Sequence, residues 1–352
     1  MSFQLTLPNG RGMVREQQLT QFAETLNQIA EQVQFRISSR GWCYQLEGYG
    51  AITKAEFARA EDLINECRRT GLLPIDFVAE EEARAFSGIE EPTSVSPEQY
   101  LGHLLKEALN AEEYYTPDWW EGEQYYIQMI VEKIDLKALF APVCDQFHIP
   151  IATTRGWSSM LQRAEYARRF RQAEDKGLQC VLLYCGDHDP DGLRISECLR
   201  RNLDELKGIT WEDGVEGYNP AKLIIDRFGL NHDFIEKNHL TWIDNLITGS
   251  GMNLASPTHP NYDLAYVQEY LHKFGAKKCE ANALVVRSRE AGELCRRAIE
   301  AYLGSDGFSR FESKRERIRR TMKRFKRRTG LLKSVNSTLK LIDQDEKASR
   351  LR

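Results

Sequence analysis

Long apolar runs are absent from this sequence of 352 residues. No stretch approaches the roughly 20 consecutive apolar residues that a membrane-spanning helix needs, so we expect no membrane-spanning protein. The first residues, MSFQLTLPNGRGMVRE, also lack the apolar centre and the small-residue cleavage site of a secretory signal. Both absences lead us to expect a cytoplasmic protein.

Paired cysteine motifs are absent as well. The eight cysteines are scattered, none lies in a CxxC motif, and the closest pair, Cys180 and Cys185, has the wrong spacing for a zinc knuckle. Several of them lie within apolar patterns, where cysteine behaves as a small buried hydrophobic residue. The cysteine usage therefore predicts a reduced, intracellular protein without a disulfide framework.

A strong net charge is the third absence. The chain has 48 Lys and Arg against 52 Asp and Glu, a formal charge of −4, which excludes a protein that is uniformly basic. The charge is nevertheless uneven. From Ser309 to the end there are 16 basic and 5 acidic residues, whereas the preceding residues hold 32 basic and 47 acidic ones. An acidic body is thus followed by a basic segment.

The first third of the sequence predicts helices. Apolar residues recur at helical spacing between residues 19 and 33. Ser38 and Ser39 offer N-cap side chains for a second helix, and Thr53 with Glu56 has the spacing of a capping box at the start of a third.

A short apolar strand is predicted at residues 72–77, after the third helix. Three helices followed by a short β element are typical of a winged-helix domain, which we assign to residues 1–95. The acidic and then Pro- and Ser-containing stretch from Glu80 to Ser96 is interpreted as its boundary.

The middle of the chain alternates between strands and helices. Because its strands are apolar at nearly every position, the pattern predicts a parallel sheet that is covered on both faces. The predicted strands are residues 125–131, 149–152, 180–184 and, less regular in composition, 239–243. The predicted helices are residues 136–147, 158–176, 193–206, 266–274, 291–303 and a strongly basic one at 310–328.

We therefore predict a mixed α/β protein in which a helical winged-helix domain precedes a Rossmann-like domain with a parallel sheet. After the domain of residues 1–95, a linker is expected at residues 96–120. The sheet domain with a C-terminal extension is assigned to residues 121–305, and a basic tail to residues 306–352.

The segment Gly186–Gly192, GDHDPDG, directly follows an apolar strand. Ligands of open α/β sheets lie beyond the carboxyl ends of the strands, so Asp187 and Asp189 are candidate metal ligands. Glu132 follows the first strand and is the third candidate. Together they predict a site for one or two Mg²⁺ ions, or Mn²⁺, of the kind that stabilises charge in phosphoryl transfer.

Other interpretations of this segment stay open. DPDG is also common in solvated turns. His188 is either a ligand for a softer metal or a side chain that points away from the acids. Asp191 is either a third ligand or a helix N-cap.

These motifs resemble the Toprim domain, which topoisomerases, primases and some nucleases share, and in particular the A subunit of topoisomerase VI and its meiotic relatives. Val131-Glu132-Lys133 resembles the VEK of that family, and Asp187-x-Asp189-Pro190-x-Gly192 resembles its DxDPxG. Two further segments, Arg155-Gly156-Trp157-Ser158 and Arg227-Phe228-Gly229-Leu230, resemble elements after its second strand and further downstream.

The resemblance also implies a catalytic tyrosine in the winged-helix domain. The family motif is an Arg, two residues, and then an aromatic pair whose second member is the nucleophile. Arg40-Gly41-Trp42-Cys43-Tyr44 has Arg40 and Tyr44 at that spacing, with Cys43 in place of the first aromatic residue. A tyrosine that attacks a phosphodiester conserves its bond energy as a phosphotyrosine, and a neighbouring Arg stabilises the developing charge. The alternative is that Tyr44 is a core or DNA-facing aromatic residue.

Three functions follow as expectations. The first is Mg²⁺-dependent DNA strand cleavage through Tyr44, assisted by Arg40, as in topoisomerase VI A-like proteins, including the stand-alone mini-A forms. The second is a Toprim nuclease that uses metal-activated water, like the D subunit of Wadjet-type plasmid-defence systems. The third is a non-catalytic DNA-binding subunit of a larger ATPase complex. The resemblance implies double-stranded DNA as a partner, a homodimer, a separate ATPase or SMC-like protein, and association with the nucleoid if the source is prokaryotic.

The segment SRFESKRERIRRTMKRFKRR has thirteen charged positions, of which eleven are basic. Such a helix neutralises phosphates and gives DNA binding a steep salt dependence. The alternative is a solvated face or one that faces a protein partner. The residues that we assign to DNA binding are Arg317, Arg319, Arg320, Lys323 and Arg324.

Overall fold

The computed structural model describes residues 7–33, 36–74, 77–79, 93–154, 160–211, 214, 217–247 and 251–350. The chain forms two compact units, Met1–Glu80 with Glu123–Gly304, and Glu81–Gly122 with Ser305–Arg352. Three sequence predictions fall outside the described residues: most of the boundary between 80 and 96, the motif at 155–158, and positions 75 and 76 of a predicted strand.

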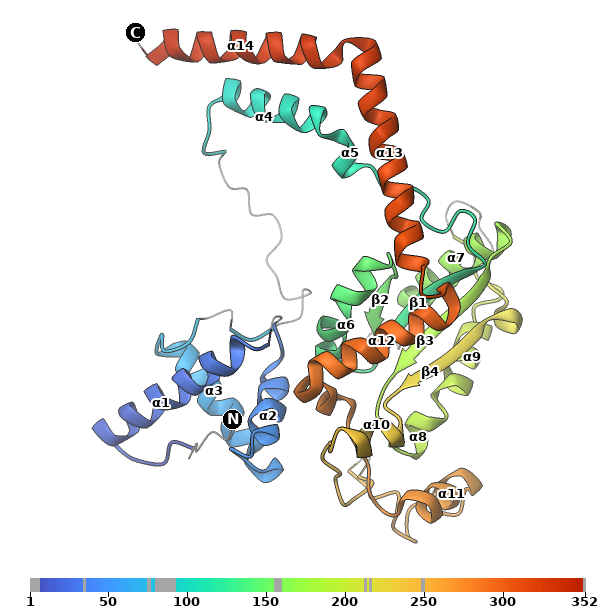
Figure 1. Ribbon diagram of the computed structural model, residues 1–352. Helices are drawn as coiled ribbons and strands as arrows, with labels where there is room; N and C mark the ends of the chain where they lie inside the picture. The colour runs from blue at the N-terminus through green and yellow to red at the C-terminus, as the bar shows by residue number, and fades with distance from the viewer. Residues whose placement is uncertain are drawn as a thin grey trace. The chain divides into compact units, whose positions relative to one another are not determined.

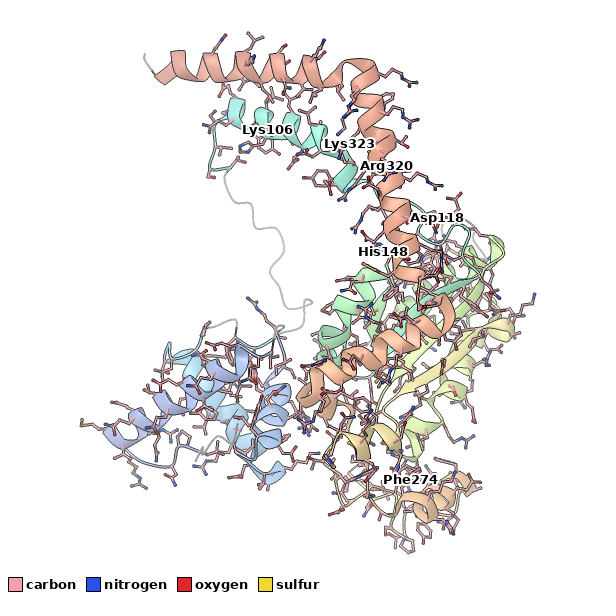
Figure 2. All side chains as sticks on the ribbon, in the orientation of Figure 1. Lys106, Asp118, His148, Phe274, Arg320 and Lys323 are labelled. Carbon is pink, nitrogen blue, oxygen red and sulfur yellow. The ribbon has the colours of Figure 1, made fainter. Side chains whose placement is uncertain are left out.

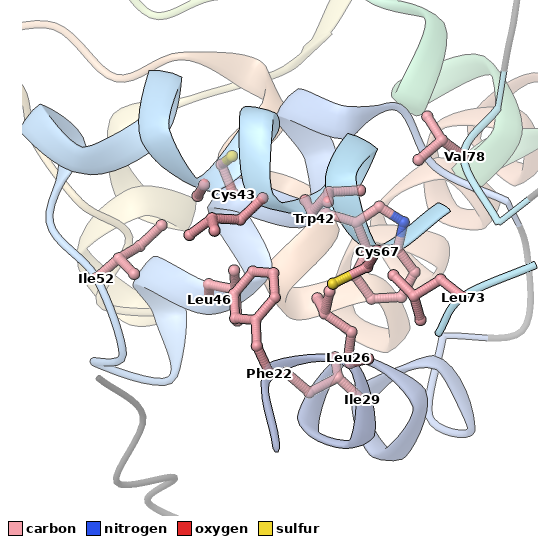
Figure 3. Close-up of a cluster of buried hydrophobic side chains, with 14 of the residues drawn as sticks. Phe22, Leu26, Ile29, Trp42, Cys43, Leu46, Ile52, Cys67, Leu73 and Val78 are labelled. Atoms are coloured by element: carbon pink, nitrogen blue, oxygen red, sulfur yellow. The ribbon is translucent and has the colours of Figure 1, made fainter. Parts of the chain in front are cut away.

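Four helical segments open the first unit: α1 (Met13–Ala30), α2 (Ser39–Gly48), the 3₁₀ turn η1 (Lys54–Glu56) and α3 (Phe57–Arg69). The capping box predicted from Thr53 and Glu56 is present at η1. The apolar faces of α1, α2 and α3 meet in one core (Figure 3). This core includes Leu19, Phe22, Leu26, Ile29, Trp42, Leu46, Leu63 and Ile64. The helices predicted for the first third are thus confirmed.

A four-stranded, entirely parallel sheet forms the centre of the same unit (Figure 1). Its strands are β1 (Tyr125–Val131), β2 (Ile151–Thr153), β3 (Gln179–Cys185) and β4 (Ile224–Gly229), in the order β2-β1-β3-β4. Almost every residue of β1 and β3 is buried, because both strands lie in the interior of the sheet. The predicted mixed α/β class with a covered parallel sheet is therefore confirmed.

The strand predicted at residues 239–243 is wrong. Ile243 forms only an isolated bridge with Lys278, and the fourth strand is β4 instead. Its sequence IIDRFG mixes apolar with charged residues because it is an edge strand and only partly buried. Of the strand predicted at residues 72–77, the described positions 72–74 and 77 have no strand conformation.

Helices cover both faces of the sheet. Neighbouring β1 side chains point to opposite faces. Met129 contacts Cys144 of α6 (Ile134–Gln146), whereas Gln128 bonds the carbonyl of Tyr166 on α7 (Met160–Asp175). The helix α12 (Ser288–Leu303) packs with α6, and α9 (Ile195–Asp204) packs with α7.

The remaining short elements of this unit lie between the strands and helices just described. They are α8 (Pro190–Leu193), η4 (Pro220–Lys222), α10 (His232–Lys237), α11 (Ala265–Phe274) and η5 (Ala281–Arg287).

The second unit consists of helices. Residues 96–120, which the sequence assigned to a linker, contain α4 (Pro97–Leu109) and α5 (Ala111–Tyr114). They pack on α14 (Leu331–Arg350) and α13 (Gly307–Thr329), respectively. A buried ion pair between Lys326 and Glu112 joins α13 to α5.

The tryptophans of this unit serve packing. Trp119 and Trp120 lie against Phe311, with ring centroids 6.1 and 5.7 Å from its ring. In the described part of the chain, no helix is both long enough and apolar enough to cross a membrane.

The helical N-terminal segment is fixed to the sheet by one buried carboxylate. Asp135, at the start of α6, is 1% exposed. It accepts hydrogen bonds from the backbone N–H and the hydroxyl of Ser38, both at 2.6 Å. The Ser38 hydroxyl in turn caps α2 by accepting the N–H of Gly41. The N-cap of one helix and the first turn of another thus depend on the same side chain.

We predict that Asp135→Ala lowers the free energy of unfolding by about 1–3 kcal/mol, because it leaves two partly buried donors of Ser38 without their acceptor. Urea denaturation followed by circular dichroism measures the change. Asp145→Ala removes an exposed carboxylate from the same helix and is the control, with an expected change within about 0.5 kcal/mol. Equal effects of the two substitutions would show that the Ser38 contact contributes nothing.

Candidate functional site

Two of the three predicted acids meet at the carboxyl edge of the sheet. Val131 of β1 is in register with Cys185 of β3, so the residues that follow these strands emerge side by side. The Glu132 N–H bonds the carbonyl of Cys185 at 3.0 Å. The Asp187 N–H bonds Oε2 of Glu132 at 2.7 Å. The pairing of the strands therefore brings Glu132 and Asp187 together.

An ammonium group lies between these two carboxylates. Lys133 Nζ is 2.5 Å from Glu132 Oε1 and 3.2 Å from Asp187 Oδ2. Burial raises the pKa of Glu132, but the charge of Lys133 and the N–H of Asp187 outweigh it and hold the pKa below its usual value. Burial and then the charge of Glu132 raise the pKa of Asp187 to about 7.

The third acid, Asp189, has a structural task in addition. It is the N-cap of α8, where its Oδ1 accepts the N–H of Gly192 at 2.6 Å. Burial raises the pKa of Asp189. The neighbouring Asp191 is not the cap, and its Oδ1 accepts the hydroxyl of Tyr266 at 2.9 Å. In this conformation, no three acidic, histidine or cysteine side chains of the described residues converge in the geometry of a metal cage.

His188 points away from the acids that flank it. Its side chain is 1% exposed, and Nδ1 lies 3.0 Å from the hydroxyl of Tyr270. The rings of Trp242 and Phe274 lie edge-on to the imidazole. Burial lowers the pKa of His188 to about 4, which keeps it neutral near pH 7. Of the two interpretations of His188, the structure favours the one without a metal.

Arg227 holds the backbone of the loop Gly186–Gly192, which we call the acidic loop. Its guanidinium donates to the carbonyls of Gly192 (2.9 Å), Asp187 (2.9 Å) and Leu230 (2.8 Å). It also donates to Oδ1 of Asn231 at 2.6 Å. The sequence placed Arg227 in a family-like element without a role. The sequence signal that could have revealed this role is a charged residue within a run that otherwise resembles a strand.

The segment around Cys279 forms an antiparallel bridge with the acidic loop. His188 and Cys279 exchange two backbone hydrogen bonds, of 2.8 and 3.1 Å, in an antiparallel bridge. The N–H of Ala281 bonds Oδ1 of Asp187 at 2.7 Å. In an antiparallel pair, side chains opposite each other share a face, so Glu280 lies on the face of Asp187. The sequence left residues 277–284 without a role.

Tyr44 lies at Glu280. Its hydroxyl donates to Oε2 of Glu280, its side chain is 2% exposed, and Lys54 Nζ lies 5.1 Å from its ring centre. Burial and then the charge of Glu280 raise the pKa of Tyr44. Arg40 is 53% exposed and lies 3.9 Å from the same carboxylate. The structure thus gathers Tyr44 and Arg40 around a residue that the sequence did not single out.

The space beside Tyr44 is small. A cavity of about 100 Å³ borders its ring and has Glu47, His239 and Arg287 in its lining. With Tyr44 only 2% exposed, its hydroxyl is closed to a bulky substrate in this conformation. Access of DNA to the Tyr44 hydroxyl requires a rearrangement.

The predicted DNA-binding residues of α13 fall into two groups. Arg319 and Arg320 form salt bridges, with Glu113 at 2.5 Å and Glu316 at 3.0 Å. Arg317, Lys323 and Arg324 are exposed and have no ion-pair partner within 4 Å among the residues that the structure describes. Figure 2 shows Arg320 and Lys323 on this helix.

Exposed arginines form a stripe along α13. Arg317, Arg320, Arg324, Arg327 and Arg328 are all exposed. Their spacing of three, four and three or four residues keeps them on one helix face.

The acidic edge, which is the edge of the sheet where Glu132 and Asp187 meet, is tightly packed around Gly186. A Cβ at this position would lie 2.7 Å from Oε2 of Glu132 and closer still to the hydroxyl of Tyr184. We predict that Gly186→Ala lowers the free energy of unfolding by about 1–3 kcal/mol, because Tyr184 is fully buried and Glu132 is held by Lys133 and by the Asp187 N–H. Gly208→Ala is the control, because a Cβ there meets no heavy atom within 4 Å. Thermal unfolding of both variants measures this, and a Gly186→Ala midpoint equal to that of Gly208→Ala would contradict it.

Comparison with known proteins gives no further guide to the site. No protein-family model matches the chain. No significant match is found among curated proteins or among solved structures. The function of the acidic edge is therefore inferred from its own residues and their geometry.

Proposed function

We propose that this protein cleaves DNA strands in a reaction that depends on Mg²⁺ or Mn²⁺, with Glu132, Asp187 and Asp189 as the residues that hold the metal. In this proposal residues 1–95 correspond to a winged-helix domain and residues 121–305 to a Toprim domain of the topoisomerase VI A-like type. The observation that carries it is the contact of Glu132 with Asp187 beyond the carboxyl ends of β1 and β3.

The residues present fit a hard divalent cation. The candidate donors are carboxylate oxygens, which Mg²⁺ and Mn²⁺ prefer over nitrogen or sulfur. The carboxylates of Glu132 and Asp187 lie side by side with limited exposure to solvent, an arrangement that a neighbouring cation stabilises. A bound divalent metal stabilises negative charge on the phosphate oxygens of a substrate. The chain itself supplies the donors and fixes their spacing through the sheet.

Burial of Tyr44 supports water as the nucleophile. A phenol attacks as the phenolate, and the surroundings of Tyr44 raise its pKa. The small cavity beside it points the same way.

A single observation favours Tyr44 as a second candidate nucleophile. Its partner Glu280 directly precedes Ala281, whose N–H bonds Asp187. Two neighbouring residues, Glu280 and Ala281, thus connect Tyr44 to Asp187 within one chain. Cleavage through Tyr44 in a homodimer, with Arg40 assisting, is the form that the family resemblance implies. A separate ATPase or SMC-like partner belongs to this form as well.

Contact with the DNA backbone is assigned to α13. Within the stripe of exposed arginines, Arg317, Arg324, Arg327 and Arg328 have the charge and the linear spacing to follow phosphates. Arg319 and Arg320 contribute less in this proposal, because Glu113 and Glu316 neutralise them.

We predict that Glu132→Gln and Asp187→Asn each reduce cleavage of a supercoiled plasmid in Mg²⁺ by at least about a hundredfold, because each removes a charged oxygen ligand of the proposed metal ion. Gel electrophoresis of the plasmid measures nicked and linear products. Glu165→Gln is the control, since it neutralises an exposed acid of α7. Retained cleavage in both acidic-edge variants would overturn the proposed site.

The same assay separates the nucleophiles when it is stopped with detergent. Water as the nucleophile predicts free DNA ends and cleavage that survives Tyr44→Phe. Protein linked to a DNA end, lost in Tyr44→Phe, would instead establish the tyrosine. If no metal or protein partner supports cleavage by the wild-type chain, the proposal fails and a non-catalytic DNA-binding subunit is the function left.

For α13, we predict that replacing Arg317, Arg324 and Arg327 together by Gln weakens DNA binding and flattens its salt dependence. Each lost phosphate contact reduces the slope of log K against log salt by about 0.9, so the triple variant loses about 2–3. Fluorescence anisotropy with a labelled duplex measures both quantities. The control replaces the exposed residues Lys237, Arg289 and Arg297 by Gln, with the same change in net charge. Equal slopes for the two triple variants would refute a specific role of α13.

A further inference from the structure

Lys133 occupies the position that a metal ion would need. It directly follows Glu132 and is the N-cap residue of α6, with an extended backbone conformation. Its ammonium contacts Oε1 of Glu132 and Oδ2 of Asp187 at once, at 2.5 and 3.2 Å. A cation that bridges these two carboxylates has to approach the same two oxygen atoms.

No other cation of the described residues takes this place. The other charged groups near the pair are Asp189 from the same loop, Glu280 from the segment that pairs with this loop, and Arg227 from β4. The guanidinium of Arg227 is committed to backbone carbonyls and to Asn231, and it forms no salt bridge with either acid. The balance of the site therefore depends on Lys133, because two buried carboxylates without a counter-ion repel each other strongly.

We propose that Lys133 is a built-in counter-ion that competes with the divalent metal for Glu132 and Asp187. This inference rests on the proposed function, since it assumes that the same acids bind metal. In the free protein the ammonium compensates the acid pair, and the metal binds only when the ammonium leaves. The side chain of Lys133 is 33% exposed, against 24% for Glu132 and 12% for Asp187, so the lysine is the most solvent-accessible of the three groups.

The competition makes an unusual prediction. Removal of a residue that contacts both candidate ligands increases metal affinity instead of decreasing it. A buried or positioning role of Lys133 alone predicts the opposite, because its loss would disorder the acids. The direction of the change thus distinguishes the two roles.

The test is isothermal titration calorimetry of the full chain with MnCl₂ at constant pH and in the absence of DNA. Lys133→Met removes the competing charge, and we expect it to bind Mn²⁺ at least about tenfold more tightly than the wild type. Lys133→Arg keeps the charge and is expected to bind no more tightly than the wild type. Lys137→Met removes a positive charge one turn further along α6 and controls for the general field of the helix. Lys133→Gln, which keeps a hydrogen-bond donor, replaces Lys133→Met if that variant does not fold.

Asp187→Asn separates failure of this inference from failure of the proposed function. If Asp187→Asn binds Mn²⁺ as the wild type does, the metal site itself is wrong. If Asp187→Asn loses Mn²⁺ but Lys133→Met binds it equally or more weakly than the wild type, the metal site stands and the competition is refuted. A gain in Lys137→Met as large as that in Lys133→Met would also refute it, because a distant charge would then be sufficient.

Discussion

Repulsion between two buried carboxylates is the constraint on which the rest of the site depends. The parallel register of β1 and β3 forces Glu132 and Asp187 to one edge of the sheet. There the Asp187 N–H and the Lys133 ammonium compensate them. In a medium of low dielectric constant, such a pair persists only with donors and a cation at contact distance. In the structure that cation is Lys133, and in our proposal a divalent metal takes its place when the protein acts on DNA.

The surroundings hold the acidic loop in place through its backbone. Arg227 binds its carbonyls from β4, and the segment around Cys279 pairs with it from the side. Gly186 leaves no room for a Cβ between the acids and Tyr184. These contacts fix the main chain of the loop. Oε1 of Glu132 and Oδ2 of Asp187 remain for Lys133, so the loop is preorganised for a cation. The contact of Tyr44 with Glu280 connects this arrangement to the N-terminal helices.

Local patterns in the sequence predicted the central strands and the acid pair, whereas contacts between distant segments could not be predicted. β1 and β3 are recognisable because interior parallel strands are continuously apolar. β4 was missed because an edge strand carries charged residues. The role of Glu280 depends on pairing with a loop more than 90 positions earlier. Burial of Tyr44 follows from packing on both sides of α2, which an amphipathic pattern does not reveal.

The central claim is that Glu132 and Asp187 bind a divalent cation in place of Lys133. The most direct measurement is the anomalous difference density of crystals soaked in MnCl₂. The account predicts a manganese peak at about 2.0–2.6 Å from carboxylate oxygens of both residues, with the ammonium of Lys133 moved away from them. Lys133 still bridging the two acids at saturating Mn²⁺, with no peak at this edge of the sheet, would contradict it.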